Sequence, residues 1–169
     1  MTYNPERVIL DDMDAKEFVE WDSRFSIGIP QIDAQHKQLI LMTNKLYKAC
    51  QYSGDSAKEQ FRATIREAVG YIRYHFTSEE KIMERIEYPG MEDHKREHRD
   101  FIQEVLEQVK DFEEGKRFVP HMFVRFLRDW VLSHIALTDT YLGEYLLHQR
   151  RGDFSEGYAQ GGTAKPASE

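Results

Sequence analysis

The strongest constraint on the fold is a helical hydrophobic repeat that recurs in four long stretches of the chain. In each stretch, apolar residues return every three or four positions, which places them on one face of a helix. Short segments with glycine, proline or serine separate the stretches, and no alternation typical of strands is found. Because short connections make sequential helices antiparallel, the sequence predicts an all-α, up-down-up-down four-helix bundle.

The predicted helices span residues 33–52, 56–86, 91–114 and 120–150. Ser56 and Glu59 have the spacing of a capping box at the start of the second helix. Gly115 stands where the third helix should end, and Pro120 suits the first turn of the fourth. The residues expected to face inward are, helix by helix, Leu39, Ile40, Thr43, Leu46 and Tyr47; Ile65, Ala68, Val69, Ile72, Phe76, Met83 and Ile86; Phe101, Ile102, Val105, Val109 and Phe112; Phe123, Leu127, Trp130, Val131, Tyr141, Leu142 and Tyr145.

Two flanking segments lie outside the predicted bundle of residues 33–150. Residues 1–32 are expected to form an arm that packs across the helices, since Phe18, Trp21, Phe25 and Ile27 make it apolar. Residues 151–169 are rich in glycine, serine and alanine, so we expect a disordered tail.

Composition narrows the class of protein. A length of 169 residues suits one domain with a single core. The net charge of −7 and the absence of a basic stripe argue against nucleic-acid binding. No apolar run is long enough for a membrane span, and the first residues do not resemble a secretory signal. The single cysteine, Cys50, cannot form an internal disulfide, so a reducing compartment, by default the cytoplasm, is expected.

Five of the seven histidines fall on the predicted inward faces, together with a glutamate. His36 lies on the side of Leu39 and Ile40 in the first helix, and His134 continues the line of Trp130 and Val131 in the fourth. The other members form two pairs with a spacing of four residues, His75 with Glu79 and His94 with His98. Side chains four apart project from one helix face, so each pair can bind one metal ion.

Taken singly, each of these residues has an ordinary structural explanation. A lone inward histidine is more often a satisfied core residue, and Glu79, His94 and His98 each stand in a charged stretch that could be a solvated face. Together they are harder to explain, because burying several histidines and a glutamate without compensation costs several kcal/mol. A shared metal site removes that cost. His121 and His148 lie near helix ends and are interpreted as ordinary residues.

These residues resemble the ligand pattern of the hemerythrins and bacterial hemerythrin-like domains. The pattern reads His36; His75-x-x-x-Glu79; His94-x-x-x-His98; His134-Ile135-x-x-x-Asp139, and the resemblance covers roughly residues 21–147. Flanking residues agree with it, namely Trp21, Ser26-Ile27-Gly28, Ile32-Asp33-x-Gln35-His36-Lys37, Tyr88-Pro89 and Trp130.

The resemblance implies a non-haem centre of two iron ions. His94, His98 and His134 would bind one iron, and His36 and His75 the other. Glu79 and Asp139 would bridge the two ions together with a solvent-derived oxo or hydroxo group. Counting positions, three histidines and three bridges fill an octahedral ion, whereas two histidines leave the second ion one ligand short. Dioxygen would bind at that open position.

Four apolar residues within about a turn of a ligand are candidates for the dioxygen pocket: Leu39, Trp130, Val131 and Ile135. Plain core packing explains any one of them equally well. Asp139 follows His134 by five residues, and a regular helix would point its carboxylate away from the site. A wide turn with i→i+5 bonding would correct this, so we expect distorted helix geometry between His134 and Asp139.

The leading hypothesis is a dioxygen-binding protein for storage, delivery or supply, and not an enzyme. The main alternative is an oxygen or redox sensor or signalling module, read by an unidentified protein partner. A third class comprises peroxide or nitric oxide reductases and ferroxidases, which need an electron-donor partner. The sequence alone also allows another metal, such as zinc, in place of iron.

Overall fold

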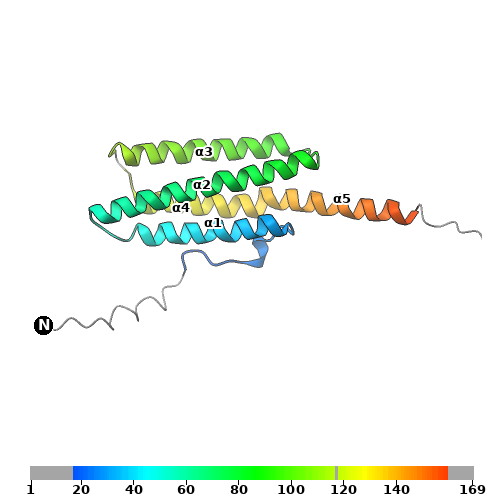
Figure 1. Ribbon diagram of the computed structural model, residues 1–169, viewed down its shortest axis with the longest axis horizontal. Helices are drawn as coiled ribbons and strands as arrows, with labels where there is room; N and C mark the ends of the chain where they lie inside the picture. Colours follow the sequence, from blue (N-terminus) through cyan, green and yellow to red (C-terminus); the bar gives the residue numbers. More distant parts are fainter. Residues whose placement is uncertain (1–16, 117, 160–169) are drawn as a thin grey trace, which may run out of the picture.

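The computed structural model describes residues 17–116 and 118–159, with side chains described to residue 150. Over these ranges the protein is an antiparallel four-helix bundle without strands, as the sequence predicted (Figure 1). The fourth helix of the bundle is one continuous rod made of α4, a π-helical turn η3, and α5. The elements are η2 (Ser23–Phe25), α1 (Pro30–Ala49), α2 (Asp55–Arg85), α3 (Met91–Glu113), α4 (Pro120–His134), η3 (Ile135–Asp139) and α5 (Thr140–Ala159).

The first helix begins earlier than predicted, at Pro30 instead of residue 33. Proline suits this position because the first turn of a helix needs no backbone N–H donor. The carboxylate of Asp33 accepts hydrogen bonds from the backbone N–H of Ile27 (2.8 Å) and the hydroxyl of Ser26 (2.7 Å). Asp33 therefore ties the arm to the first turn of α1.

The predicted capping box of the second helix is wrong. α2 begins at Asp55 after Gly54, and no side chain caps its first turn. Gly54 has a positive φ of 99°, a backbone conformation that favours glycine. Glu59 instead forms an ion pair with Arg62 on the surface of the helix. At the end of α3, Gly115 also has a positive φ (66°), in agreement with its predicted role as terminator.

The fourth helix contains the predicted distortion, a π-helical turn over Ile135–Asp139. A π turn holds one residue more than an α turn, so the faces of the helix shift after it. Tyr141, expected to face inward, is 63% exposed for this reason, whereas Leu142 is fully buried. The helix also extends to Ala159, beyond the expected end near residue 150. The tail beyond residue 159, for which disorder was predicted, lies outside the described residues. The first part of the arm, residues 1–16, lies outside them as well.

Two apolar clusters fill the bundle, one on each side of a polar layer. The larger cluster includes Leu39, Phe76 and Ile135, and the smaller one consists of Ile27, Ile29, Ile32, Met83 and Leu142. Along α1, α2 and the fourth helix, the chain passes from one cluster to the other within about two turns. The residues between them are His36, Glu79 and Asp139, so the polar layer crosses the bundle between two dry regions.

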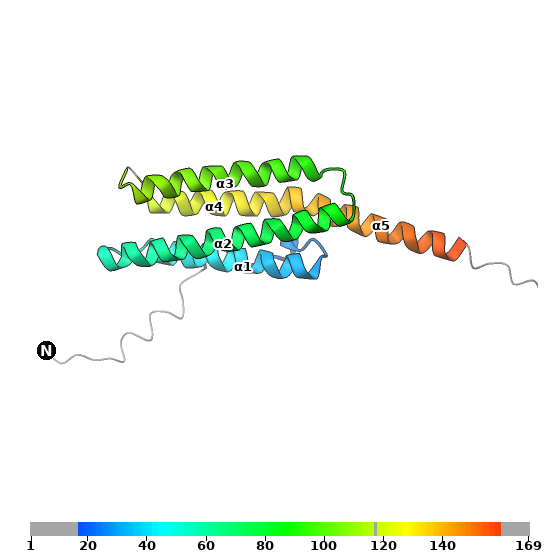
Figure 2. The ribbon, with the colours of Figure 1, turned by 45° about the horizontal axis from the view of Figure 1, so that its top comes forward.

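The arm lies against the bundle beside α1 (Figure 1), partly hidden behind α1 and α2 in the turned view (Figure 2). Phe18 and Phe25 of the arm pack on the larger cluster, and Ile27 and Ile29 belong to the smaller one. The side chain of Asn44 donates to the carbonyl of Val19 and accepts from its N–H, both at 2.8 Å. Further along, the arm crosses α5 at Gly143, where a Cβ atom would lie 2.3 Å from the carbonyl oxygen of Ile27. Only glycine allows this approach. Both contacts hold the arm in one position beside the polar layer.

In the described part of the chain, no helix is long and apolar enough to cross a membrane.

Candidate metal centre

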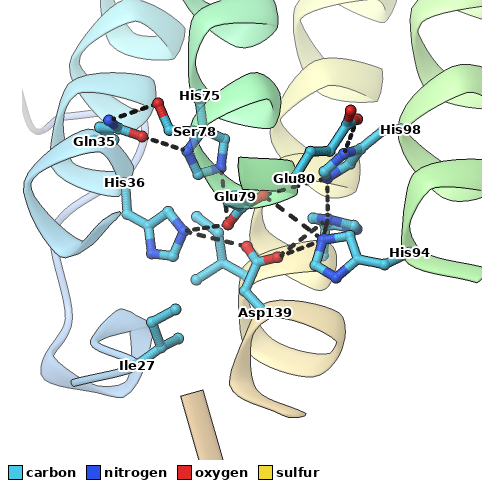
Figure 3. Close-up of polar contacts among 12 residues, drawn as sticks. Ile27, Gln35, His36, His75, Ser78, Glu79, Glu80, His94, His98 and Asp139 are labelled. Atoms are coloured by element: carbon cyan, nitrogen blue, oxygen red, sulfur yellow. Dashed lines mark hydrogen bonds and ion pairs between the residues drawn. The ribbon is translucent and has the colours of Figure 1, made fainter. Parts of the chain in front are cut away.

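The seven predicted ligands meet in the polar layer, and each is at least 95% buried. His36, Glu79 and Asp139 are fully buried, and the remaining histidines are between 1% and 5% exposed. They come from all four helices of the bundle and point toward one another (Figure 3). They form two overlapping groups that could each hold a metal ion, one of His36, His75, Glu79 and Asp139, the other of Glu79, His94, His98 and His134.

The two carboxylates divide their oxygen atoms between the two groups. Glu79 Oε1 lies 3.5 Å from His75 Nε2 and 3.8 Å from His36 Nε2, whereas its Oε2 lies 3.3 Å from His98 Nε2 and 3.6 Å from His94 Nε2. Asp139 Oδ2 lies 3.2 Å from His36 Nε2, and its Oδ1 lies 3.2 Å from both His94 and His134 Nε2. Each carboxylate therefore has the geometry of a bridge between two cations.

The Nε2 atoms of three histidines converge on one point. His134 Nε2 lies 3.1 Å from His98 Nε2 and 3.2 Å from His94 Nε2. Two nitrogens that each lie about 2.1 Å from one ion at a right angle are about 3 Å apart. The observed spacing thus fits three nitrogens on adjacent positions of a single ion.

The cluster lacks the compensation that buried polar atoms need. Both oxygens of Glu79, both oxygens of Asp139 and Nε2 of His36 are buried without a hydrogen-bond partner. Unpaired buried carboxylate oxygens cost several kcal/mol. These atoms point into the site from opposite sides, so two cations would pair with all of them at once. Histidine with carboxylate is a donor set suited to iron and also to zinc.

Four of the five histidines turn their second ring nitrogen toward an acceptor. On one side, His36 Nδ1 lies 3.1 Å from the backbone carbonyl of Phe25, and His75 Nδ1 lies 3.1 Å from the side-chain oxygen of Gln35. An acceptor at Nδ1 fixes the tautomer that leaves Nε2 free for a metal. Gln35 is itself held, because its amide donates to Ser78 at 3.2 Å.

On the other side the acceptors are carboxylates. His134 Nδ1 lies 3.0 Å from Glu97 Oε2, and His98 Nδ1 lies 3.4 Å from Glu80 Oε1. The same oxygen of Glu97 accepts from the hydroxyl of Thr138, in the π-helical turn, at 2.8 Å. His94 differs, since its buried Nδ1 has no partner among the described residues.

The carboxylates dominate the electrostatics of the site. Burial lowers the pKa of His36, but Asp139 and Glu79 outweigh it and raise that pKa to about 10; the same balance raises the pKa of His94 to about 9. For His75 burial prevails and lowers the pKa. Burial acts to raise the pKa of both carboxyl groups, but the surrounding histidines hold it well below the ordinary range. The site therefore favours positive charge, whether protons or metal ions.

The four predicted pocket residues surround one small void beside the histidines. Leu39, Trp130, Val131 and Ile135 line it together with His75 and His134, and its volume is about 10 Å³. A void of about this size holds roughly one water molecule. Trp130 covers its outer side by stacking on His134 with a centroid distance of 4.3 Å. This space therefore suits only a very small ligand.

The residues that orient the histidines are not recognisable as such in the sequence. Gln35 belongs to the flanking pattern of the resemblance, but nothing there assigns it a role, and Glu80 and Glu97 have the pattern of a solvated helix face. The carboxylates of Glu80 and Glu97 are indeed 34% and 48% exposed. Their role depends on contacts between helices, which no local spacing reveals. His121 and His148 are both exposed.

Comparisons with known proteins agree with this geometry. The family profile described as "Hemerythrin HHE cation binding domain" matches residues 27–146. A bacteriohemerythrin of Stenotrophomonas maltophilia is 34% identical over 119 residues, which cover 70% of this chain and 75% of that protein. A bacteriohemerythrin of Methylococcus capsulatus is 28% identical over 124 residues, covering 73% of this chain and 92% of its own. The crystal structure of a wild-type hemerythrin superposes with a TM-score of 0.70 at 27% identity, covering 75% of this chain and 96% of that one.

Proposed function

The chain belongs to the hemerythrin family, and on that premise we propose that it holds two iron ions and binds dioxygen reversibly. His94, His98 and His134 would bind one ion, and His36 and His75 the other. Glu79 and Asp139 would bridge them. When bound, the two irons supply the electrons and the open coordination position that hold dioxygen.

The observation that carries this proposal is the unequal division of the seven side chains. The bridging geometry of both carboxylates serves the two groups equally, but three histidines face one group and two face the other. The group of His36 and His75 is thus one protein ligand short. His75 of this group also borders the small void, whose other lining residues apart from His134 are apolar; an apolar lining limits the access of water and so slows the irreversible oxidation that water and protons promote.

Storage, delivery or supply of dioxygen agrees with the small size of the void, which leaves no room for an organic substrate beside the open position. Peroxide and nitric oxide are small enough for the same position, so the void does not decide between a dioxygen carrier and a reductase of these molecules. Reversibility of dioxygen binding separates the two classes. A cytoplasmic location stays a prediction from the sequence.

A sensing role is the second candidate, and one contact supports it. The backbone carbonyl of Phe25, in the arm, accepts from His36 at 3.1 Å. A change in the bond between His36 and its ion would therefore reach the arm directly. A partner that reads the position of the arm would make the protein a sensor.

An anaerobic titration tests the proposal. The bound metal is quantified and reduced, dioxygen is admitted, and the visible spectrum is followed while dioxygen is removed and readmitted. We expect two irons per chain and a coloured adduct that disappears on purging and returns on re-exposure.

Two results would overturn the proposal. Irreversible conversion to the diferric form on first contact with dioxygen would point to redox enzymology. A colourless protein with two zinc ions after expression in iron-replete medium would remove iron from the site. A change in proteolysis at the arm on dioxygen binding would favour the sensor over the store.

A further inference from the structure

A wide groove runs along the surface between α2 and α3 and reaches the metal centre. It is shallow and largely open to solvent, with a volume of about 620 Å³, enough for a small molecule that keeps one face exposed. Its apolar part is made of Phe76, Ile102 and Leu106. Leu106 is 41% exposed, a large apolar side chain left open to solvent. We call this feature the α2–α3 groove.

The α2–α3 groove borders one proposed iron ligand, His98. The His98 ring lines the groove, and Phe76 stacks on it with a centroid distance of 3.6 Å and an interplanar angle of 5°. On its inner side, His98 Nε2 lies 3.3 Å from Glu79 Oε2. A single imidazole ring therefore separates a molecule in the groove from the metal centre.

The charges around the groove favour an anionic occupant. Arg73, Arg99 and Lys110 line it, and among the described residues neither guanidinium group has a hydrogen-bond or ion-pair partner. The lining also contains the carboxylates of Glu80 and Glu107, which accept from His98 at 3.4 Å and from Gln103 at 3.0 Å, and Lys110 pairs with Glu114 at 3.9 Å. Arg73 and Arg99 are thus the cations left to pair with a ligand.

We propose that the α2–α3 groove binds a planar aromatic anion that donates electrons to the metal centre through His98. This chemistry is shared by reduced flavin nucleotides and by hydroquinones that carry an acidic group. The aromatic body would lie on Ile102 and Leu106, and the anionic group would pair with Arg99 or Arg73. The inference rests on the proposed function, because a ferrous dioxygen binder that oxidises must be reduced before it can bind again.

The electrons and protons balance in this step. One reduced flavin or hydroquinone gives up two electrons and two protons and becomes the oxidised flavin or quinone. Each of two ferric ions takes one electron and becomes ferrous, and the two protons pass to water. No further reactant is needed.

The groove and the void are separate spaces with the side chain of Phe76 between them, which separates the donor from dioxygen. The void borders His75 and His134, and its volume of about 10 Å³ excludes a donor of this size. The groove borders His98, on the ion whose protein ligands are complete. Electrons can therefore enter without the donor occupying the dioxygen position.

Equilibrium dialysis of the protein as isolated tests binding directly. The probes are oxidised flavin mononucleotide and 1,4-naphthoquinone-2-sulfonate. Leu106→Glu places a carboxylate in the groove, and Leu41→Glu makes the same change at an exposed leucine of α1 (53% exposed) outside it. We expect saturable binding of one probe per chain, weakened about tenfold or more in Leu106→Glu and unchanged in Leu41→Glu.

A second pair of variants tests the charge. Arg99→Gln should weaken binding of either probe several-fold, since both are anionic. Arg125→Gln, at an exposed position on α4, should not. Binding of flavin alone would assign the site to flavins, and binding of the sulfonate alone to hydroquinones. No saturable binding of either probe, or equal binding by Leu106→Glu and Leu41→Glu, would overturn the proposal.

Reduction kinetics then test the electron step. With diferric protein, Leu106→Glu should slow reduction by reduced flavin or hydroquinone by about the factor lost in binding, and leave the rate with dithionite unchanged. Equal slowing by both reductants would show a damaged centre and would contradict entry through the groove. The dialysis needs neither iron nor dioxygen. Failure of the groove proposal and failure of reversible dioxygen binding are therefore distinguishable.

Discussion

The two halves of the metal centre differ in what surrounds their histidines. His36 and His75 turn to neutral acceptors, a backbone carbonyl and a buried amide, and the void of about 10 Å³ lies between His75 and His134 of the other half. His98 and His134 turn to the carboxylates of Glu80 and Glu97, and His98 lines a groove of about 620 Å³. Carboxylate partners raise the basicity of a ligating histidine, whereas neutral partners do so less. The half with His98 and His134 therefore has more electron density on its histidines and borders the open groove. The half with His36 and His75 has the open coordination position.

The two halves therefore differ in the partners of their histidines as well as in the number of their histidines. The shared carboxylates couple the halves, because each has one oxygen in each group. The outer partners then make the halves unequal without changing the ligands. Variants that remove a bridging carboxylate, a histidine ligand or a partner of a histidine should show which of these contributes most to iron binding.

Asp139→Asn should have the largest effect, since it removes the coupling. An amide nitrogen cannot take the place of the second carboxylate oxygen, so one half loses a ligand, the other keeps only a neutral amide oxygen, and the bridge is lost. We expect bound iron to fall from about two ions per chain to near zero. The loss of metal affinity should exceed the roughly 100-fold typical when a residue hydrogen-bonded to a ligand is replaced. Metal analysis after gel filtration measures it, with Asp129→Asn, an exposed aspartate of α4, as control. Retention of two irons would show that Asp139 is not a bridge.

Comparing His75→Ala with His98→Ala tests the ligand count. Without His75, one half keeps a single histidine and two carboxylate oxygens; without His98, the other keeps two histidines and two oxygens. We expect His75→Ala to retain about one iron per chain and His98→Ala about two, more weakly bound. Circular dichroism serves to confirm that both variants fold. Equal loss from the two variants would mean that the halves do not differ in this way.

A pH titration should reveal a property that the halves share. In the protein without metal, the pKa values of about 10 for His36 and about 9 for His94 place one bound proton in each half at pH 8. Loading two ions at pH 8 should release about two protons per chain. The overall binding constant for the two ions together should therefore rise about 100-fold per pH unit near pH 8. An indicator dye in weak buffer measures the release. Release of no protons would contradict these pKa values.

The same groups set the pH dependence of stability without metal. Their pKa values are raised above the unfolded value of about 6.5, so their contribution is fully present below that pH. It is lost as the pH rises through about 9 to 10. The melting temperature of the metal-free protein should therefore fall from pH 7 to pH 10, and that of the loaded protein should change less.

Glu97→Gln should have the smallest effect, because it changes only an outer partner. It makes the acceptor of His134 neutral, as the acceptors in the other half are, and should weaken iron binding about 10- to 100-fold. Thr138→Val separates the loss of charge from the loss of the hydroxyl contact with the π turn. Glu104→Gln, an exposed position on α3, is the control. Unchanged iron affinity and reduction potential in Glu97→Gln would contradict the electronic difference inferred between the halves.

The fold and the meeting of the ligands are predictable from the sequence because both depend on helical periodicity. Asp139 is instructive: the resemblance makes it a ligand, its spacing of five residues from His134 then predicts a wide turn, and that turn is present. The inward position expected for Tyr141 is wrong because the same turn shifts the register of every later residue. Glu80 and Glu97 could not be recognised, because their contacts join residues from different helices.

The π turn also sets the register of two distant features at once. If the same five residues formed an ordinary α turn, every later residue would rotate by about 100° about the helix axis relative to α4. Asp139 would then leave the site, and Gly143 would no longer face Ile27, so a side chain would meet the arm at that crossing. Deleting one residue within 135–138 would remove the need for the wide turn, because Asp139 would then follow His134 by four residues and share its face on a regular helix. The bridge and the docking of the arm therefore depend together on the match between the number of residues in this segment and the type of its turn.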